Sequence, residues 1–481
     1  MLDASPRRSR RRVAIAASVV AALLLAPASA SAHGLGGTRS LPIPEWLFAW
    51  AAAIVLVVSF VGLSILWTRP RLAQLAEGRS RAVPVAVRRT GRVVLGALGV
   101  AFWVLTVWAG LTGTENVQTN VAPTMVYIWF WVGVPVLSVF VGNLWRAISP
   151  WRAIADLAAW VGTRVAGKEG LPAPAVWPAR IGLWPAAAVL VAFAWLELAA
   201  PDRDAPDLLG LLALLYGAIM LIGSGVWGTR FLDQADGFDR YFRLAGTLAP
   251  LRWADGRVHL RWPGTGLAEV RAETGLAAVV LALVGATTFD GLSAGELWTS
   301  DGSPGVWLTE RMTDLGFAPT GAGTAADTIG LAVTIALITG FVRLGIAGVR
   351  SVDPERLVSR DLMGRFAPTL VPIAIGYAVA HYVSYLLQQG QALGFQLSDP
   401  RGTGADWFGT AGWTVDYSVL SGNSVWYVQV VALVLGHVAG LVAAHDLALR
   451  TFRGPRAAAR SQYWMLAVMV AFTSLGLWLL S

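Results

Sequence analysis

Cysteine is absent from all 481 residues, and charged residues are scarce. The missing cysteine excludes disulfides, zinc–thiolate sites, iron–sulfur clusters and thiol nucleophiles. Only 14% of the residues are Asp, Glu, Lys or Arg, while 56% are hydrophobic. A soluble protein of this length needs far more charged surface than this composition supplies. We therefore predict an all-α integral membrane protein, a polytopic bundle of transmembrane helices surrounded by a lipid bilayer.

The N-terminus has the composition of a secretory signal peptide. Five arginines within residues 7–12 precede an apolar run, Val13–Leu25, and small residues follow up to Ala32. A basic start, a short apolar stretch and a small-residue cleavage site are typical of such peptides. We predict that residues 1–32 are removed and that 33–481 form a single integral-membrane helical domain. An uncleaved membrane anchor is the alternative.

Apolar windows of about membrane-spanning length recur ten times along the chain. They lie near Trp46–Trp67, Val93–Thr112, Ala122–Asn143, Ile181–Ala200, Leu208–Gly228, Thr274–Phe289, Thr328–Val342, Phe366–Leu387, Val425–Ala444 and Tyr463–Ser481. Of the 37 Lys and Arg residues, 28 fall in alternate connections, and only four fall in the other connections and the mature N-terminus. Because basic residues stay in the cytoplasm, this asymmetry predicts ten spans in the plasma membrane with both termini outside. The distribution of the basic residues thus indicates the orientation of the protein in the membrane. It does not indicate a nucleic-acid partner.

Four connections are predicted to have structure of their own. Residues 143–163, on the inner side, have Trp, Arg and aliphatic residues at the spacing of an amphipathic interface helix. The inner segment 229–272 contains an Asp255-Gly256 turn between two alternating runs, which indicates a hairpin loop. The outer connections 290–327 and 388–424 are long and contain several aromatic residues, so we expect them to cover a cavity as lids.

Ionisable side chains at membrane depth are costly, so each one is a candidate functional residue. The predicted spans contain Glu197, His381, His437 and the pair His445-Asp446. Asp290 directly follows the sixth predicted span. It is expected on the outer side of the membrane, as are Glu197 and His381.

Two helices carry these histidines in distinct settings. Tyr377 and His381 begin a polar stripe that continues at helical spacing through Ser384, Tyr385 and Gln388. Because lipid does not tolerate such a stripe, we expect it to face the bundle interior. Next to His437, Gly436 and Gly440 form a surface of small residues that lets another helix approach. His437 is therefore either a contact between helices or a functional group.

The predicted depths of the histidines argue against one compact metal centre. At about 1.5 Å per residue, His437 lies about 18 Å from the outer face, His381 about 9 Å and His445 about 30 Å. His381 and His437 are the candidate metal ligands, and they could share an ion only if the span boundaries shift by several residues. The cofactor is left open, with a divalent metal ion preferred to haem.

Several short segments together resemble one group of proteins. They are His33-Gly-Leu-Gly-Gly-Thr, Val121-Ala-Pro-Thr-Met, Ser149-Pro-Trp-Arg-Ala153, Phe289-Asp-Gly-Leu292, Ala380-His-Tyr-Val-Ser384 and the run His437–Asp446. On these segments the chain resembles actinobacterial multispanning membrane proteins commonly labelled fenitrothion hydrolase. The resemblance implies a membrane-bound activity on an organophosphate triester, a lipophilic substrate. It supplies no catalytic residues.

One function class is a membrane-bound hydrolase. It would hold a small lipophilic substrate in an outward cavity, with His381 as base or metal ligand and with Glu197 or Asp290 as its partner. A close approach of His381 to one of these carboxylates would favour this class.

The other class is a proton-coupled or metal-ion transporter. The transported solute or its proton would follow a relay or pathway through His437, His445 and Asp446, with Tyr377. Helices broken at Pro368 and Pro372 or at Gly436 and Gly440 would favour this class.

Overall fold

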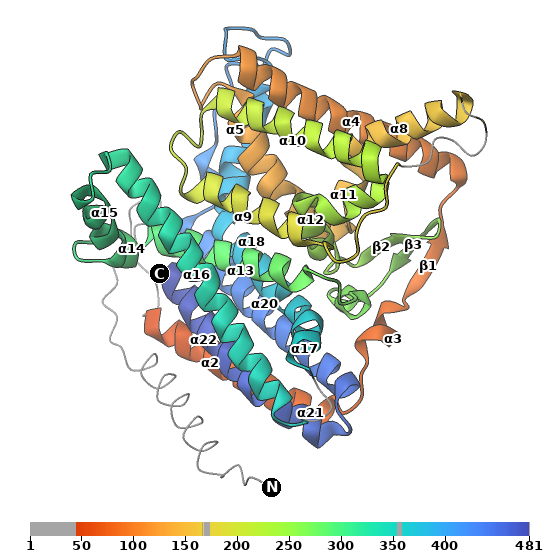
Figure 1. Ribbon diagram of the computed structural model, residues 1–481, viewed down its shortest axis with the longest axis vertical. Helices are drawn as coiled ribbons and strands as arrows, with labels where there is room; N and C mark the ends of the chain where they lie inside the picture. Colours follow the sequence, from red (N-terminus) through yellow and green to blue (C-terminus); the bar gives the residue numbers. More distant parts are fainter. Residues whose placement is uncertain (1–44, 166, 168–173, 354–357, 481) are drawn as a thin grey trace.

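The computed structural model describes residues 45–480, apart from 166, 168–173 and 354–357. Figure 1 shows a predominantly helical molecule in which most long helices run in one broad direction. The predicted signal segment, residues 1–32, lies outside the described residues.

Each of the ten predicted spans corresponds to helical structure. The helices are α2 (Glu45–Leu66), α4 (Val85–Thr112), α5 (Val121–Pro123) continued by the π-helix η1 (Thr124–Gly133) and α6 (Val134–Val141), α9 (Trp184–Leu198), α10 (Pro206–Trp227), α13 (Leu276–Ala294), α16 (Pro319–Arg350), α18 (Val371–Gln388), α20 (Gly422–Thr451) and α22 (Tyr463–Leu480). Among the described residues, seven of these segments are long and apolar enough to cross a membrane, while α9 and the apolar part of α2 are shorter.

Shorter elements connect the long helices. They are α3 (Leu72–Ala76), α7 (Trp145–Ile148), α8 (Pro150–Val165), α11 (Thr229–Ala235), α12 (Gly237–Gly246), α14 (Glu296–Thr299), α15 (Pro304–Asp314), α17 (Ser359–Phe366), α19 (Leu393–Gln396), α21 (Pro455–Ser461) and the 3-10 turns η2 (Thr265–Glu269), η3 (Ala367–Leu370), η4 (Gln389–Ala392) and η5 (Tyr417–Val419).

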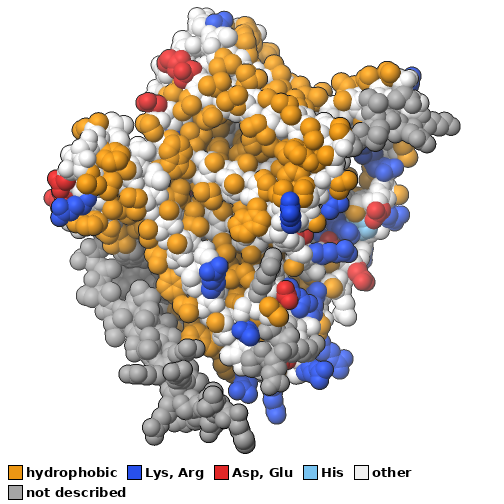
Figure 2. Space-filling view, viewed as in Figure 1, with side chains coloured by type: hydrophobic (Ala, Val, Ile, Leu, Met, Phe, Trp, Pro, Cys, Tyr) orange, Lys and Arg blue, Asp and Glu red, His pale blue; other side chains and the backbone are white. Residues whose placement is uncertain are grey.

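The molecular surface fits a multi-pass membrane protein. Figure 2 shows a broad apolar surface over the long helices, and arginine side chains gather on the side where β1, β3, α17 and α21 lie. Isoleucine, leucine and valine side chains are exposed along α4, α10 and α16. An apolar surface of this extent is stable against lipid and unstable against water.

A small sheet lies at the basic side of the molecule. The predicted hairpin is present as β2 (Leu251–Ala254) and β3 (Arg257–Leu260), with Asp255 and Gly256 both at positive φ in the turn between them. A third strand, β1 (Arg79–Ala82), pairs with β3 in the order β1-β3-β2. The all-α prediction is therefore right for the bundle, and the hairpin prediction is right for β2 and β3. The third strand was missed, because β1 pairs with a segment far away in sequence.

Two predicted loops are largely helical. Inner residues 229–272 include α11 and α12 before the hairpin, and nine of the ten residues of α12 are buried. Outer residues 290–327 include the end of α13, then α14, α15 and the start of α16. Burial against neighbouring helices explains α12, since tertiary packing outweighs weak local propensities. It does not explain α14 and α15, in which Gly305 is the one buried residue. The outer segment 388–424 holds mostly short turns, as predicted.

Two long helices meet at the predicted glycine surface. Gly436 of α20 faces α18, where a Cβ atom at Gly436 would lie 2.6 Å from the carbonyl oxygen of Pro372. Gly376 approaches from the other side, and a Cβ there would lie 3.2 Å from the Cα of Gly436. Only residues without side chains allow this approach, which confirms the predicted role of the small residues. Because α20 is continuous through this region, it is not broken at Gly436 or Gly440.

Candidate functional site

The three residues predicted to act together meet at one end of the bundle. Glu197 lies in the last turn of α9, Asp290 in the outer part of α13, and His381 in the middle of α18. Asp290 is inside its helix rather than in the outer loop where the sequence placed it. His381 Nε2 lies 3.2 Å from Asp290 Oδ2.

Tyr382 joins the second carboxylate to this pair. Its hydroxyl donates to Asp290 Oδ2 at 2.6 Å and lies 3.2 Å from Glu197 Oε1. The four side chains therefore form one chain of contacts, from His381 through Asp290 and Tyr382 to Glu197. Sequence reasoning missed Tyr382 because it lies off the polar stripe, and its position next to His381 was the only signal.

The histidine end of the chain of contacts is partly open. His381 has a side-chain exposure of 25%, against 15% for Asp290. The neighbouring Tyr377 stacks on the His381 ring with centroids 5.8 Å apart and an angle of 12° between the planes. Tyr377 is buried, and Tyr385 further along α18 is exposed. The predicted polar stripe thus faces the interior only at Tyr377 and opens toward its outer end.

An apolar cavity lies beside Tyr382 within the bundle. It is small, and its lining includes Trp131, Leu190, Tyr241, Ala286, Ala378 and Tyr382. These residues come from η1, α9, α12, α13 and α18, so the cavity lies among the helices that carry the site. The Trp131 ring packs against Tyr241, with centroids 5.1 Å apart. An apolar lining next to ionisable groups is typical of small-molecule sites, although this cavity, about 20 Å³ in volume, has room for about one water molecule.

An arginine on the connection between α9 and α10 lies at the outer side of the site. Arg203 is near enough to Glu197 to interact with its carboxylate electrostatically. Its carbonyl oxygen accepts a hydrogen bond of 2.8 Å from the Tyr127 hydroxyl, and its Nη1 donates to the Leu198 carbonyl at 3.4 Å. The positive charge of Arg203 is therefore held over the outer end of α9.

Of the four predicted relay residues, Tyr377 stacks on His381, whereas His437, His445 and Asp446 lie apart from this chain of contacts. His437 is buried; its Nδ1 contacts the Leu433 carbonyl of its own helix at 2.8 Å, and its Nε2 has no hydrogen-bond partner among the described residues. His445 Nε2 lies 3.1 Å from the Trp67 carbonyl oxygen. Neither histidine has a hydrogen bond to Asp290, Tyr382 or Glu197 within the part of the chain that the structure describes.

Asp446 anchors the segment that follows α2. Its Oδ1 accepts hydrogen bonds from Trp67 Nε1 at 3.1 Å, from the Arg71 backbone at 2.6 Å and from the Leu72 backbone at 3.1 Å. Its other oxygen pairs with Arg450. A carboxylate that accepts backbone N–H groups at the start of α3 acts as a helix cap, so Asp446 has a complete structural role.

Metal ligation is not favoured by the arrangement of side chains. In the ranges that the structure describes, no group of three or more His, Asp and Glu residues could hold a metal ion. His381 and His437, the predicted ligands, have separate partners, Asp290 and the Leu433 carbonyl, and neither belongs to a three-ligand group among the described residues.

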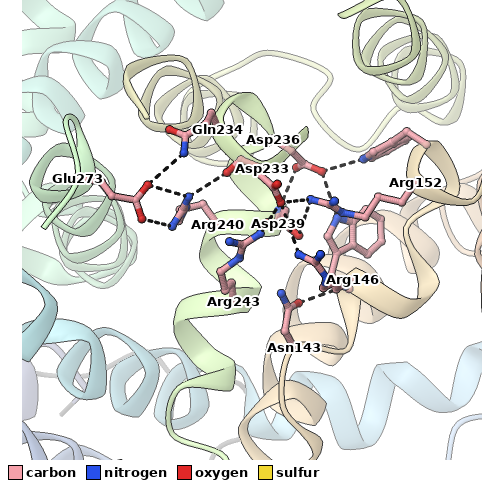
Figure 3. A network of polar contacts seen from close by, with 12 residues as sticks. Asn143, Arg146, Arg152, Asp233, Gln234, Asp236, Asp239, Arg240, Arg243 and Glu273 are labelled. Atoms are coloured by element: carbon pink, nitrogen blue, oxygen red, sulfur yellow. Dashed lines mark hydrogen bonds and ion pairs between the residues drawn. The ribbon is translucent and has the colours of Figure 1, made fainter. Parts of the chain in front are cut away.

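A second polar cluster lies on the inner side and was not predicted. Figure 3 shows side chains from α7, α8, α11 and α12 pointing toward one another around three aspartates. Asp236 caps α12 and accepts from Trp151 Nε1 at 2.8 Å, Trp145 Nε1 at 3.2 Å and the Tyr216 hydroxyl at 2.9 Å. Four donors, counting the Asp239 backbone N–H, thus converge on one buried carboxylate.

Ion pairs complete this inner cluster. Asp233 lies 2.8 Å from Arg152 and 2.9 Å from Arg243, and Asp239 lies 2.7 Å from Arg243. Burial alone would raise the pKa of Asp233, but the two guanidinium groups outweigh it and hold that pKa below its usual value. Burial and the nearby Asp239 raise the pKa of Asp236. The acids at 233, 236 and 239 do not share one helix face, because Asp236 has an extended backbone between α11 and α12.

One further sequence pattern falls beside the site. Gly291-Leu-Ser-Ala-Gly295 matches the Gly-x-Ser-x-Gly pattern of serine hydrolases, in which the serine lies on a sharp turn from strand to helix. Here the segment ends a helix, and the Ser293 hydroxyl donates to the Asp290 carbonyl at 3.0 Å. The local structure therefore does not present Ser293 as a nucleophile.

Comparisons of the chain with protein-family models, with curated proteins and with solved structures found no match.

Proposed function

We propose that this protein is a plasma-membrane hydrolase that cleaves a small lipophilic ester at the outer end of its helix bundle. Organophosphate triesters, which the resemblance implies, belong to this substrate class. The observation that carries the proposal is the contact of 3.2 Å between His381 Nε2 and Asp290 Oδ2, on a histidine that is still partly exposed.

His381 is the proposed general base. Asp290 holds Nε2 and stabilises the positive charge that forms when the ring takes a proton. Nδ1, which has no hydrogen-bond partner in the part of the chain that the structure describes, is left to accept a proton from water. The resulting hydroxide attacks the phosphorus or carbonyl carbon of the ester, and the bond to the leaving-group oxygen breaks.

The other end of the chain of contacts supplies the proton that the leaving group needs. Tyr382 has one hydroxyl hydrogen and two carboxylate neighbours, so it can donate to only one of them. The shorter contact is to Asp290, at 2.6 Å. The contact to Glu197 at 3.2 Å is then favourable when Glu197 holds a proton and donates it to the Tyr382 oxygen. Glu197 is the proposed acid, and Arg203 the proposed cation for the developing negative charge.

The substrate class follows from the surroundings of the site. The adjoining cavity is apolar, with aromatic and aliphatic residues in its lining. A neutral lipophilic ester can partition into the bilayer, whereas a charged substrate would pay a desolvation cost. The lining matches such an ester in polarity, but the cavity of about 20 Å³ must widen before an ester can enter it.

The test is hydrolysis by purified protein in lipid nanodiscs. A chromogenic triester, followed by absorbance of the released aryl alcohol, should be cleaved by the wild-type protein and not above background by His381→Ala. His259→Ala, which removes a histidine on the hairpin, is the matched control and should retain activity. Equal rates for the wild-type protein and His381→Ala would overturn the proposal.

Proton-coupled transport is the second candidate, and one observation favours it. The α-helix is interrupted at the 3-10 turn η3, which contains Pro368 and precedes α18. A helix interruption of this kind, close to the helix that carries His381, is common in transporters. Vesicles that contain the protein would then show a pH-dependent solute flux that His437→Ala abolishes. Flux that is unchanged in His437→Ala would reject the predicted relay.

A further inference from the structure

The segment 397–421, between α19 and α20, has a defined conformation. The Thr114 backbone N–H donates to the Arg401 carbonyl at 2.8 Å, and the Val121 N–H donates to the Pro400 carbonyl at 3.0 Å. Within the segment, Asp406 accepts from the Ala411 N–H at 3.0 Å. The hydrogen bond from the Ala411 N–H is the main cause that lowers the pKa of Asp406. The segment is therefore fixed both to the end of α4 and to itself.

Large apolar side chains nevertheless point away from the protein along this segment. Their exposed fractions are 56% for Trp407, 69% for Phe408, 63% for Trp413 and 61% for Tyr417. We call these four residues the aromatic patch. A water-facing loop that is otherwise held by hydrogen bonds would not keep four aromatic rings exposed, so the patch marks a contact surface.

The aromatic patch is continuous with the apolar surface of α4. The Trp407 ring stacks on Trp108 of α4, with centroids 6.0 Å apart and 18° between the planes. Trp108 and Leu111 lie in the last two turns of α4 and are themselves exposed, in line with Val104 one turn earlier. α4 is one of the seven helices long and apolar enough to cross a membrane among the described residues. The patch therefore begins where this apolar surface ends.

The cationic side chain of Arg401 lies beside Trp108, near the end of α4. The Arg401 guanidinium is 5.5 Å from the centre of the Trp108 ring, and its Nε donates to the Thr112 carbonyl at 3.0 Å. Trp and Tyr rings are enriched at the headgroup level of a bilayer, where an arginine can also pair with lipid phosphate. The combination of rings and cation at a helix end fits a lipid headgroup region better than a protein partner.

We infer that the aromatic patch lies in the headgroup region of the outer leaflet, with its rings against phospholipid. In this arrangement the segment 397–421 lies along the membrane surface instead of extending into the external solution. The inference concerns a lipid contact and does not depend on the proposed hydrolysis.

The lipid contact would be connected to the helix that carries His381. Gln391, one turn after α18, donates through Nε2 to the Asp416 carbonyl at 3.1 Å, and the Asp416 N–H donates to Gln391 Oε1 at 3.1 Å. Tyr417, the next residue, belongs to the aromatic patch. Tyr417 of the patch therefore directly follows the residue that joins this segment to Gln391, just beyond the end of α18.

The absence of cysteine from the sequence allows a direct test. Single-cysteine variants Phe408→Cys, Leu111→Cys and Asp314→Cys carry a nitroxide spin label in phospholipid nanodiscs. Collision rates are then measured with oxygen, which concentrates in lipid, and with a water-soluble nickel complex. Leu111→Cys is the lipid-facing control, and Asp314→Cys is the water-facing control on α15.

We expect the oxygen-to-nickel collision ratio at Phe408→Cys to be several-fold above that at Asp314→Cys and close to that at Leu111→Cys. A ratio equal to that at Asp314→Cys would show that the patch faces water and would overturn the inference. Protection from both reagents, with a second label within measurable distance, would show that another copy of the chain covers the patch, which also overturns it. Thermal unfolding of each labelled protein checks that it remains folded.

Discussion

His381 Nε2 lies 3.2 Å from Asp290 Oδ2, although 91 residues separate the two in sequence and they belong to different helices. An acidic partner on one ring nitrogen orients a histidine and favours its protonated form. The sequence analysis proposed a histidine and a carboxylate, His381 and Asp290, as partners in one site. Their contact is the basis of the predictions on activity.

Asp290→Asn should reduce ester hydrolysis without abolishing binding. The amide keeps the size of the side chain but removes the negative charge that stabilises a protonated His381. A positioned base contributes about 10²- to 10⁴-fold to the rate, so we expect kcat to fall within that range. The measurement is the steady-state rate in nanodiscs at saturating substrate. Asp416→Asn, on the outer segment, is the matched control, and an equal fall in that variant would contradict the assignment.

Tyr382→Phe tests the proton link between the two carboxylates. Loss of a hydrogen bond to a charged group costs about 1.5–3 kcal/mol, which corresponds to a rate loss of roughly 10- to 100-fold. The effect should depend on the leaving group, because a poor leaving group needs the proton more than a good one does. Tyr385→Phe provides the control on the same helix. A Tyr382→Phe rate equal to the wild-type rate for both kinds of leaving group would exclude the link.

Asp233→Asn should destabilise the inner cluster in a pH-dependent way. The pKa of Asp233 is held below its usual value of 3.8, so the folded protein favours the charged form. This contribution is present above pH 3.8 and is lost as pH falls through the lower folded pKa. At neutral pH we expect a loss of about 1–2 kcal/mol, since the side chain is partly exposed. Thermal unfolding in detergent should show a difference at pH 7 that shrinks below pH 3.8; a constant difference would contradict the ion pairs.

Asp446→Ala separates a structural role from a relay role. The substitution leaves Trp67 Nε1 and two backbone N–H groups without their acceptor and leaves Arg450 unpaired. We expect unfolding to become easier by about 2–4 kcal/mol, since several buried donors lose one partner. Asp361→Ala, which removes an exposed carboxylate from the first turn of α17, should cost no more than about 1 kcal/mol. A folded Asp446→Ala protein of normal stability that has lost proton flux would instead favour the relay.

Gly436→Ala should weaken the contact between α18 and α20. The added Cβ would lie 2.6 Å from the Pro372 carbonyl oxygen, so the helices must separate. Overpacking of this kind costs about 1–3 kcal/mol. At Gly340 of α16 a Cβ meets no atom within 4 Å, so Gly340→Ala should keep or slightly raise stability. Equal melting temperatures for both variants would show that the close approach does not matter for folding.

The long helices could be predicted because their apolar runs depend on local sequence alone. The buried helix α12 could not be predicted, because the burial of Phe238, Tyr241 and Phe242 depends on the helices around them. β1 escaped prediction for the same reason, since its partner strand begins at Arg257.

The residues of the candidate site could likewise be predicted only in part. Scarcity of charge selects Glu197, Asp290 and His381 from the sequence, but only the packing of α9, α13 and α18 shows that Tyr382 joins them. The depths predicted along the two helices placed His381 and His437 at different levels of the membrane. In the structure His381 contacts Asp290, whereas His437 contacts the Leu433 carbonyl.

The most direct test of the central claim is the rate at which purified protein in nanodiscs hydrolyses a chromogenic lipophilic triester, compared with His381→Ala and His259→Ala. The account predicts turnover by the wild-type protein and by His259→Ala, and loss of that turnover in His381→Ala, with all three proteins folded. Turnover that persists in His381→Ala, or no turnover by the wild-type protein across a series of lipophilic esters, would contradict it.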